Sequence, residues 1–327
     1  METLLLTGDE VKELLSMEEV IKEVEVAFRE KGLKKVQMPP KIYIFYPKGD
    51  LRAMPSYLEN LKISAVKVVN VHPDNPLKYN LPTVMATIIL IDPENGFPLS
   101  IMDGTLITDY RTGAAGGVAA KYLARREAKV LALVGAGRQA KTQLQALLCI
   151  YKEFEEVRVY SRTKERLEKF IKEVSNFYQG SIKGFDILEK VVKGADIVVT
   201  TTPSREPIVM DNWVDKGTHF NCIGADAPGK EELDPNILKR AKIVVDDWEQ
   251  ACHSGEINVP LSKGIIKEED IYGELGEIVV GLKKGREKDD EITIFTSTGL
   301  AIQDAVTAHM IYHKALRKGL GKFVKWI

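Results

Sequence analysis

The sequence has few cysteines, no excess of charge of either sign and no long apolar run. Its three cysteines, Cys149, Cys222 and Cys252, are far apart and form no CxxC pair, which argues against a disulfide framework and a zinc site. Lys and Arg number 46 and Asp and Glu 47, so there is no basic field for nucleic acid. The longest apolar runs, 130–136 and 197–202, have the length of strands and fall far short of the ~20 residues of a membrane-spanning helix. We therefore expect no metal, no nucleic acid and no membrane partner.

The beginning of the chain and its length give two further expectations. Acidic residues occur within the first ten positions, without a basic segment or a small-residue cleavage site, so we expect a cytoplasmic protein. A chain of 327 residues is long enough for two domains at the usual ~150 residues each.

The middle of the chain alternates short Val- and Ile-rich runs with helical stretches. This alternation is typical of βαβ units and of a parallel sheet that is buried on both faces. Between the first two runs, Arg138 to Phe154 has the apolar spacing of a helix. We predict an α/β fold with a Rossmann-type doubly wound domain at 119–302, whose expected strands lie within 129–135, 156–161, 195–203, 219–224, 241–247 and 291–297.

The two ends of the chain have a different pattern. An amphipathic helix is expected near 17–31, followed by strand-like pieces at 41–46, 65–71 and 83–91 that are joined by Pro, Gly and Asn turns. This pattern predicts an α+β domain with an antiparallel sheet over 1–118.

Helical spacing returns at Gly299 to Leu320. We expect this helix to pack on the N-terminal domain, so that 303–327 completes the domain formed by 1–118. A helix over 114–125 is expected to carry the chain from one domain to the other.

A glycine-rich turn after the first parallel strand resembles a dinucleotide-binding fingerprint. Gly135 permits a tight turn, Gly137 lets the backbone approach a pyrophosphate, and Ala140 lets helix and strand pack closely. Arg138 and Gln139 open the helix whose free N–H groups would hold the anion. The alternative is a glycine-rich turn that binds no ligand.

The end of the second strand lacks the carboxylate that an NAD site uses to bind the ribose 2′-hydroxyl. The chain has Ser161, Arg162 and Thr163 there, and a guanidinium with two hydroxyls suits a 2′-phosphate. We therefore predict a preference for NADP over NAD. The alternatives are dual specificity and a solvated arginine on a surface turn.

Four charged residues are candidates for amino-acid chemistry. Asp226 follows the strand 219–224, at the edge where α/β sheets bind ligands, and it either acts as a base or caps a turn. Lys67 lies in a β-rich run, where it must either meet an anion or reach solvent. Arg52 and Lys41 are further cations for a substrate carboxylate, although Lys41 suits a solvated position.

Three other features have no assigned chemistry. His309 and His313 have a metal-ligand spacing without a third ligand nearby, so we expect ordinary helix-face histidines. Cys222 is expected to pack in its strand, and the loop around Glu256 has no predicted role.

Several long motifs point to one family. Gly96–Thr105, Thr108–Leu123, Ile223–Leu233 and Ser297–Asp304 resemble segments of the ornithine cyclodeaminase and mu-crystallin family, and the resemblance extends over essentially the whole chain. Arg52–Pro55 and Lys67–Pro73 resemble the archaeal alanine dehydrogenases within it.

The resemblance implies a homodimer joined through its N-terminal sheets, and it also implies roles for residues. Lys67 matches a residue that meets the substrate carboxylate and assists proton transfer, and Asp226 matches the acid/base carboxylate. Arg52 stands where the cyclodeaminases have a glutamate, which disfavours ornithine. The implied cofactor contacts are Thr83, Arg111, Thr112, Thr202, Ile223, Gly224, Ala225, Lys230 and Ser297.

The function implied by the resemblance is an NAD(P)-dependent alanine dehydrogenase, which interconverts alanine with pyruvate and ammonia. The alternatives are an NADPH-dependent ketimine or imine reductase, an ornithine cyclodeaminase, and an NADPH-binding protein without enzymatic activity. Ser161, Arg162 and Thr163 favour the ketimine reductase among these rivals, because that branch has a similar Asn-Arg-Thr sequence.

Overall fold

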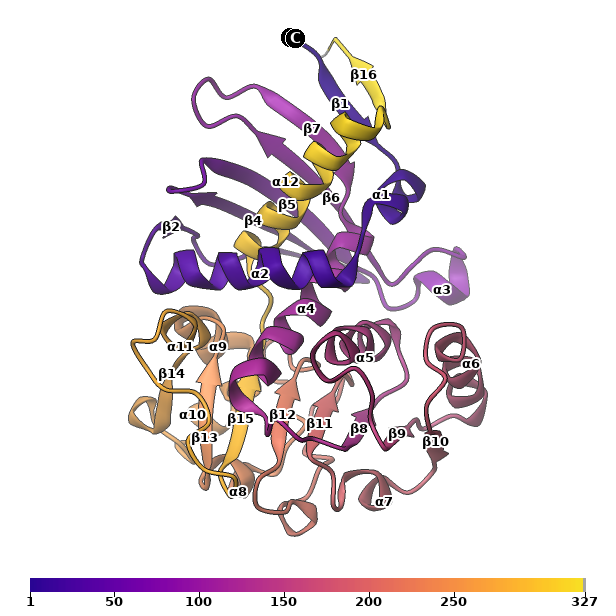
Figure 1. Cartoon of the computed structure of the whole chain (residues 1–327), viewed down its shortest axis with the longest axis vertical. Helices are drawn as coiled ribbons and strands as arrows, with labels where there is room; N and C mark the ends of the chain where they lie inside the picture. Colours follow the sequence, from indigo (N-terminus) through magenta and orange to yellow (C-terminus); the bar gives the residue numbers. More distant parts are fainter. Residues whose placement is uncertain (326–327) are drawn as a thin grey trace. The chain divides into compact units, whose positions relative to one another are not determined.

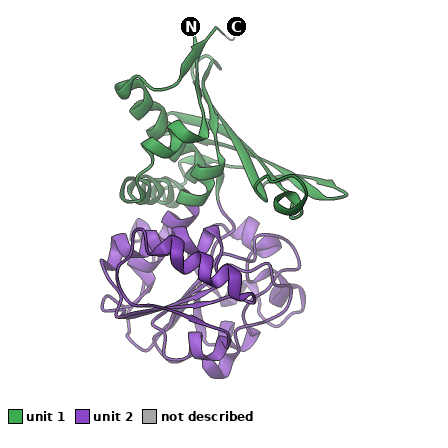
Figure 2. Ribbon diagram, turned by 90° about the vertical axis from the view of Figure 1, so that its right-hand side faces the viewer, with its two compact units in different colours: residues 1–111, 300–327 green, residues 112–299 purple. Residues whose placement is uncertain are grey.

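A computed structural model describes residues 1–325, and it divides the chain into two compact units. Unit 1 contains Met1–Arg111 and Leu300–Ile327, and unit 2 contains Thr112–Gly299 (Figure 2). The division falls inside a helix, α4 (Thr105–Leu123), rather than after residue 118. No helix in the described residues is both long and apolar enough to cross a membrane.

Unit 1 is a mixed sheet covered by helices. The sheet order is β16-β1-β7-β6-β5-β4-β2, with β3 paired to β4 (Figure 1). All pairs are antiparallel except β1 with β7, so the predicted antiparallel sheet has one parallel pair. The strands are β1 (Thr3–Leu6), β2 (Val36–Gln37), β3 (Ile42–Tyr46), β4 (Gly49–Leu58), β5 (Ile63–Val71), β6 (Val84–Ile91), β7 (Pro98–Asp103) and β16 (Lys322–Val324).

Helix α12 (Ala301–Lys318) lies across β4, β5 and β6 and packs against α2 (Met17–Gly32). The apolar core beneath it includes Met54, Val69 and Ala301. This packing agrees with the expected return of the C-terminal helix to the N-terminal sheet. The other helices of this unit are α1 (Gly8–Leu14) and α3 (Asn75–Lys78).

Unit 2 is a doubly wound domain with a fully parallel sheet of eight strands in the order β10-β9-β8-β11-β12-β15-β13-β14. The predicted Rossmann-type fold is confirmed. The strands are β8 (Val130–Val134), β9 (Glu156–Tyr160), β10 (Ile182–Phe185), β11 (Ile197–Thr200), β12 (His219–Cys222), β13 (Ala241–Val245), β14 (Ile271–Glu274) and β15 (Ile292–Thr296).

The helices of unit 2 cover the sheet, with α5 and α6 following the first two strands (Figure 1). The strand order reverses between β8 and β11, which is where such sheets bind ligands at their carboxyl edge. The helices are α5 (Arg138–Tyr151), α6 (Lys164–Val174), α7 (Leu188–Val192), α8 (Pro235–Leu238), α9 (Trp248–Ser254), α10 (Asn258–Ser262) and α11 (Leu275–Val279).

The prediction of a helix over 114–125 was wrong about where that helix begins. Helix α4 starts at Thr105, where the Asp103 carboxylate accepts a hydrogen bond from the Leu106 N–H at 3.2 Å. Residues 111–120 are buried on every side, so the helix has no polar face to reveal its period.

Candidate functional site

Arg52 and Lys67 lie on the buried face of the unit 1 sheet. In the antiparallel pair β4–β5, Arg52 is opposite Val69 and Met54 is opposite Lys67. Side chains alternate along each strand, so all four point to the face on which Met54 and Val69 pack against Ala301 of α12. Arg52 is 7% exposed and Lys67 is 1% exposed. The alternative in which Lys67 reaches solvent is therefore excluded.

The ammonium group of Lys67 belongs to a buried ionic cluster. Its Nζ lies 2.6 Å from Oδ2 of Asp304 and 3.3 Å from Oγ1 of Thr108. The other oxygen of Asp304, Oδ1, accepts a hydrogen bond from Nε of Arg111 at 3.0 Å, and Nη1 of Arg111 donates to Gln303. The Asp304 carboxylate therefore pairs with two cations, Lys67 and Arg111.

Burial lowers the pKa of Lys67 to about 7, and the positive charges of Arg111 and Lys41 act in the same direction. Asp304 opposes the shift because it favours the charged form. Lys67 can therefore gain or lose a proton near neutral pH, as an acid/base group requires.

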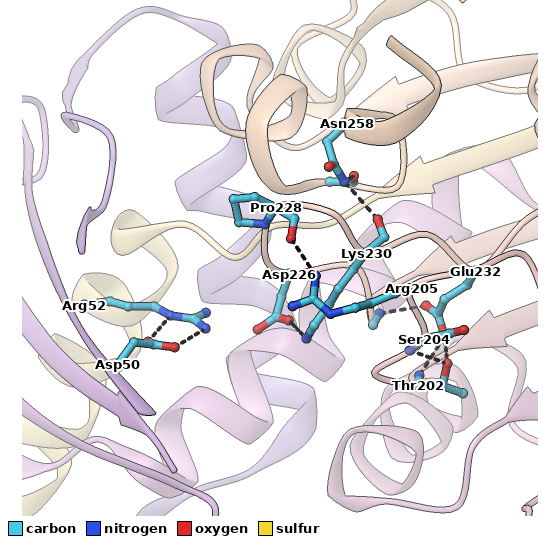
Figure 3. A network of polar contacts seen from close by, with 12 residues as sticks. Asp50, Arg52, Thr202, Ser204, Arg205, Asp226, Pro228, Lys230, Glu232 and Asn258 are labelled. Atoms are coloured by element: carbon cyan, nitrogen blue, oxygen red, sulfur yellow. Dashed lines mark hydrogen bonds and ion pairs between the residues drawn. The ribbon is translucent and has the colours of Figure 1, made fainter. Parts of the chain in front are cut away.

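Arg52 is held by a neighbouring carboxylate on the same strand. Its Nε donates to Oδ1 of Asp50 at 2.7 Å and its Nη2 to Oδ2 at 3.3 Å (Figure 3). The guanidinium also lies over the ring of Tyr43, 5.3 Å from its centroid. These contacts orient the guanidinium fork and restrict its rotamers.

The glycine-rich turn of unit 2 has the shape that a pyrophosphate requires. Gly135 has φ +116°, and a Cβ there would lie 2.5 Å from Oγ1 of Thr201. A Cβ on Gly137 would meet no atom of the described residues within 4 Å, apart from its chain neighbours, so protein packing does not require glycine at that position. The turn leads directly into α5, which begins at Arg138 without a side-chain cap. Open space beside uncapped helical N–H groups fits a dinucleotide phosphate.

Asp226 lies in the loop that follows β12. Its Oδ1 is 2.5 Å from Nζ of Lys230, and Figure 3 shows the two side chains pointing at one another. The Asp226 side chain is 36% exposed, so a ligand can reach the carboxylate. The loop is fixed at Gly229 and Lys230, where Oδ1 and Nδ2 of Asn258 contact the Gly229 N–H and the Lys230 carbonyl at 2.9 Å.

Comparisons with known proteins identify the family. The family model for the ornithine cyclodeaminase/mu-crystallin family matches residues 1–319. This chain belongs to the ornithine cyclodeaminase/mu-crystallin family. It is 52% identical over 326 residues to the alanine dehydrogenase of Archaeoglobus fulgidus, covering 100% of this chain and 99% of that protein.

Two solved structures of related proteins contain nicotinamide dinucleotides. An archaeal alanine dehydrogenase dimer with bound NAD has a TM-score of 0.96 and 52% identity, covering 100% of both chains. The Δ1-pyrroline-2-carboxylate reductase of Thermococcus litoralis, in complex with NADH and L-proline, has a TM-score of 0.95 and 43% identity, covering 98% of this chain and 100% of that one. This member of the ornithine cyclodeaminase/mu-crystallin family is an oxidoreductase.

The structure places the remaining candidate residues of this family member in three groups. Arg111 and Thr112 are buried on α4, and Thr83 precedes β6. Ser161, Arg162 and Thr163 link β9 to α6, and Arg162 and Thr163 are exposed. The rest lie at or near the ends of strands or at the start of α5, namely Gln139, Ala140, Thr202, Ile223, Gly224, Ala225 and Ser297.

Asp304 and Glu232 were missed from the sequence, and Glu256 was noted only as part of a loop without a predicted role. Asp304 pairs with Lys67. The signal that could have identified it is an aspartate among the apolar positions of a helix. Glu232 and Glu256 are completely buried, but they stand in segments whose charged or polar residues resemble a solvated surface.

The two histidines of α12 face one another, with their Nε2 atoms 2.9 Å apart. Burial of His309 and the charge of His313 lower the pKa of His309 to about 4. Within residues 1–325, no group of three or more His, Cys, Asp or Glu side chains is placed to hold a metal ion.

Proposed function

We propose that this oxidoreductase interconverts L-alanine with pyruvate and ammonia. The observation that carries the proposal is the pair of oriented, buried cations on β4 and β5, Arg52 and Lys67, which suit a small monocarboxylate substrate. The similarity to an archaeal alanine dehydrogenase over the whole chain supports the same choice.

Unit 1 binds the substrate carboxylate in this proposal. The fork of Arg52 supplies paired N–H donors, and the ammonium of Lys67 supplies a second cation. Lys41 contributes positive charge near Lys67. A second amino group, as in ornithine, would be repelled by these cations.

Unit 2 supplies the acid/base group. Asp226 accepts a proton from the substrate ammonium in the oxidative direction. After releasing that proton to solvent, it takes a proton from the water that attacks the imine and yields pyruvate and ammonia. In the reductive direction it returns the proton. Lys230 orients the carboxylate through their 2.5 Å contact.

A nicotinamide dinucleotide bound to unit 2 would accept or supply the hydride. We propose that Gly135, Gly137 and the first residues of α5 hold its pyrophosphate, with Arg111 and Thr112 as further phosphate contacts. The remaining proposed contacts are Thr83, Gln139, Ala140, Thr202, Ile223, Gly224, Ala225, Lys230 and Ser297.

We propose that Ser161, Arg162 and Thr163 favour NADP through its 2′-phosphate. No carboxylate stands at these three positions, and the exposed guanidinium of Arg162 can move to the phosphate without leaving a partner in the core.

We propose that the protein is a homodimer. Ile42, Ile44, Phe45 and Tyr46 of β3 are between 42% and 74% exposed, and large exposed apolar patches mark interaction surfaces. Sedimentation of the wild type and of Phe45→Glu tests this proposal. A dimer that dissociates in the variant supports it, and a monomeric wild type contradicts it.

The proposed reaction is tested by following reduced-nicotinamide absorbance with the purified protein. Each substrate is offered with the appropriate NAD(H) and NADP(H) forms. The substrates are pyruvate with ammonium, pyruvate with methylamine, a cyclic imine acid, and ornithine. Ammonium-dependent oxidation of the reduced cofactor with pyruvate is the expected result. Activity with the cyclic imine alone would assign a ketimine reductase, and cofactor binding without turnover would favour a binding protein.

A further inference from the structure

Two buried glutamates in unit 2 have no part in the proposed reaction. Glu232 and Glu256 are both 0% exposed, and no ion pair reaches either carboxylate within residues 1–325. A buried carboxylate without a cation is costly unless hydrogen bonds or a proton compensate it.

Glu232 joins the loops that follow two neighbouring strands of the sheet. Its Oε1 accepts hydrogen bonds from the N–H and from Oγ1 of Thr202, both at 2.7 Å, in the loop after β11. Its Oε2 accepts one from the N–H of Gly224 at 3.1 Å, just after β12. A Cβ on Gly224 would lie 2.5 Å from this oxygen, so the loop can approach only because that residue is glycine. Figure 3 shows Glu232 beside Thr202.

Glu256 holds the backbone of Glu232 itself. Its Oε1 accepts hydrogen bonds from the N–H groups of Glu232 at 2.8 Å and Leu233 at 2.7 Å. Its Oε2 is buried and has no hydrogen-bond partner among residues 1–325. The loop that bears Asp226 is therefore fixed by Glu232 at Gly224 and by Asn258 at Gly229 and Lys230.

Three acidic groups and one thiol lie close enough to act on one another here. Glu256 and Glu232 repel one another, Glu231 adds negative charge although it pairs with Lys263 at 3.2 Å, and the Cys222 thiol lies nearby. Burial raises the pKa of Glu232 to about 7. Burial and the charge of Glu232 raise the pKa of Glu256 well above its usual range.

We infer that Glu232 and Glu256 form a positioning pair for the Asp226 loop, in which Glu256 is a neutral acid and Glu232 an ionised acceptor. The functional part of this inference rests on the proposed role of Asp226. Three donors converge on the two oxygens of Glu232, which requires a carboxylate. Two donors reach only one oxygen of Glu256, and its other oxygen can carry the proton.

Replacement by glutamine should preserve the hydrogen bonds of Glu256 and disrupt those of Glu232. In Glu256→Gln, the amide oxygen keeps both N–H donors and the NH2 group takes the place of the protonated oxygen. In Glu232→Gln, the NH2 group must face a backbone N–H of either Thr202 or Gly224. A buried donor is then left unsatisfied and the loop is displaced.

The apparent melting temperature at pH 5.5 and pH 8 tests the state of Glu256. The native state keeps the Glu256 proton while the unfolded chain releases it above its usual pKa of 4.5, so this group lowers wild-type stability as the pH rises. Glu256→Gln should therefore melt higher than the wild type, with a larger gain at pH 8. A smaller gain or a loss at pH 8 would show that Glu256 is ionised and would overturn the inference.

The kcat at pH 8 tests the positioning role of Glu232. Glu232→Gln should lose at least about tenfold in kcat, the effect expected of one orphaned buried donor, while it keeps a cooperative melting transition. Glu249→Gln, which changes an exposed glutamate of α9, is the control and should keep a kcat close to that of the wild type. A Glu232→Gln variant as active as this control would overturn the inference.

The melting and kcat experiments distinguish a failure of this inference from a failure of the proposed function. The melting experiment needs no substrate, so it tests the protonation of Glu256 even if alanine is not the substrate. If the wild type turns over a different substrate, the kcat comparison is made with that substrate.

Discussion

The Nζ atom of Lys67 lies 2.6 Å from Oδ2 of Asp304 although the two residues belong to opposite ends of the chain. The other oxygen of this carboxylate is 3.0 Å from Nε of Arg111. Asp304 thus links the lysine proposed to bind the substrate carboxylate to the arginine proposed to bind the cofactor phosphates. Its charge favours the protonated form of Lys67 against the effect of burial.

We predict that Asp304→Asn destabilises the protein and impairs catalysis. The change leaves two buried cations without their shared carboxylate. Breaking a buried ion pair by removing one partner lowers the free energy of unfolding by about 3–5 kcal/mol. Thermal melting and kcat/KM for pyruvate measure the two effects. Asp290→Asn, on an exposed turn, is the control, and a variant of Asp304 that behaves like this control would contradict the role assigned to Asp304.

We predict that carboxylate binding weakens above neutral pH. The pKa of Lys67 is about 7, and only the protonated ammonium attracts a carboxylate. The inhibition constant of oxamate, an unreactive analogue of pyruvate, should therefore rise with pH, approaching about tenfold per pH unit in the alkaline range. An inhibition constant that is constant from pH 6 to pH 9 would contradict a titrating Lys67 at the site.

Most of the parallel sheet could be predicted because its strands are continuous apolar runs, which are typical of strands buried on both faces. The edge strands β10 and β14 were not predicted, because they are short and only partly buried. The start of α4 was missed for a different reason. Its polar residues Thr108, Asp109 and Arg111 are buried along with its apolar residues, so the sequence has no amphipathic period there.

We predict that Asp226→Asn abolishes most turnover and preserves cofactor binding. The amide cannot take the proton from the substrate ammonium, and loss of a general base typically lowers the rate by about 10²–10⁴-fold. Single-turnover kinetics and fluorescence titration with reduced cofactor separate the two properties. Unchanged kcat in this variant would exclude Asp226 as the acid/base group.

We predict that Gly137→Val loses cofactor affinity without loss of stability. In the part of the chain that the structure describes, a Cβ at this position meets no atom within 4 Å beyond its chain neighbours, so the new side chain occupies the space proposed for the pyrophosphate. Gly135→Val is the contrasting variant, since its φ of +116° and its contact with Thr201 make a side chain unfavourable in the folded protein itself. Wild-type affinity in Gly137→Val would place the phosphates elsewhere.

We predict that Arg162→Ala lowers kcat/KM for NADPH much more than for NADH. A charge-assisted contact with the 2′-phosphate is worth about 1.5–3 kcal/mol, which corresponds to roughly one to two orders of magnitude. Arg166→Ala, an exposed arginine of α6, is the matched control. Equal losses with both cofactors would show that Arg162 does not bind the 2′-phosphate.

The sequence indicated candidates that adjoin recognisable local patterns, namely the fingerprint turn, the strand-end aspartate and the lysine in a β-rich run. Asp304, Glu232 and Glu256 acquire their roles only through contacts between segments that are distant in sequence. The role of Glu256 could not be predicted from local sequence patterns, because its hydrogen bonds to residues 232 and 233 depend on how two loops of unit 2 fold together.

The central claim is that the protein joins ammonia to pyruvate by hydride transfer, and isotopic labelling tests it most directly. The wild type is incubated with pyruvate, ¹⁵N-ammonium and a reduced cofactor that carries deuterium at the transferable position. The account predicts alanine that contains both ¹⁵N and deuterium at its α-carbon, and a strong loss of this product in Asp226→Asn. Oxidation of the cofactor by a cyclic imine acid, with no labelled alanine formed, would contradict it.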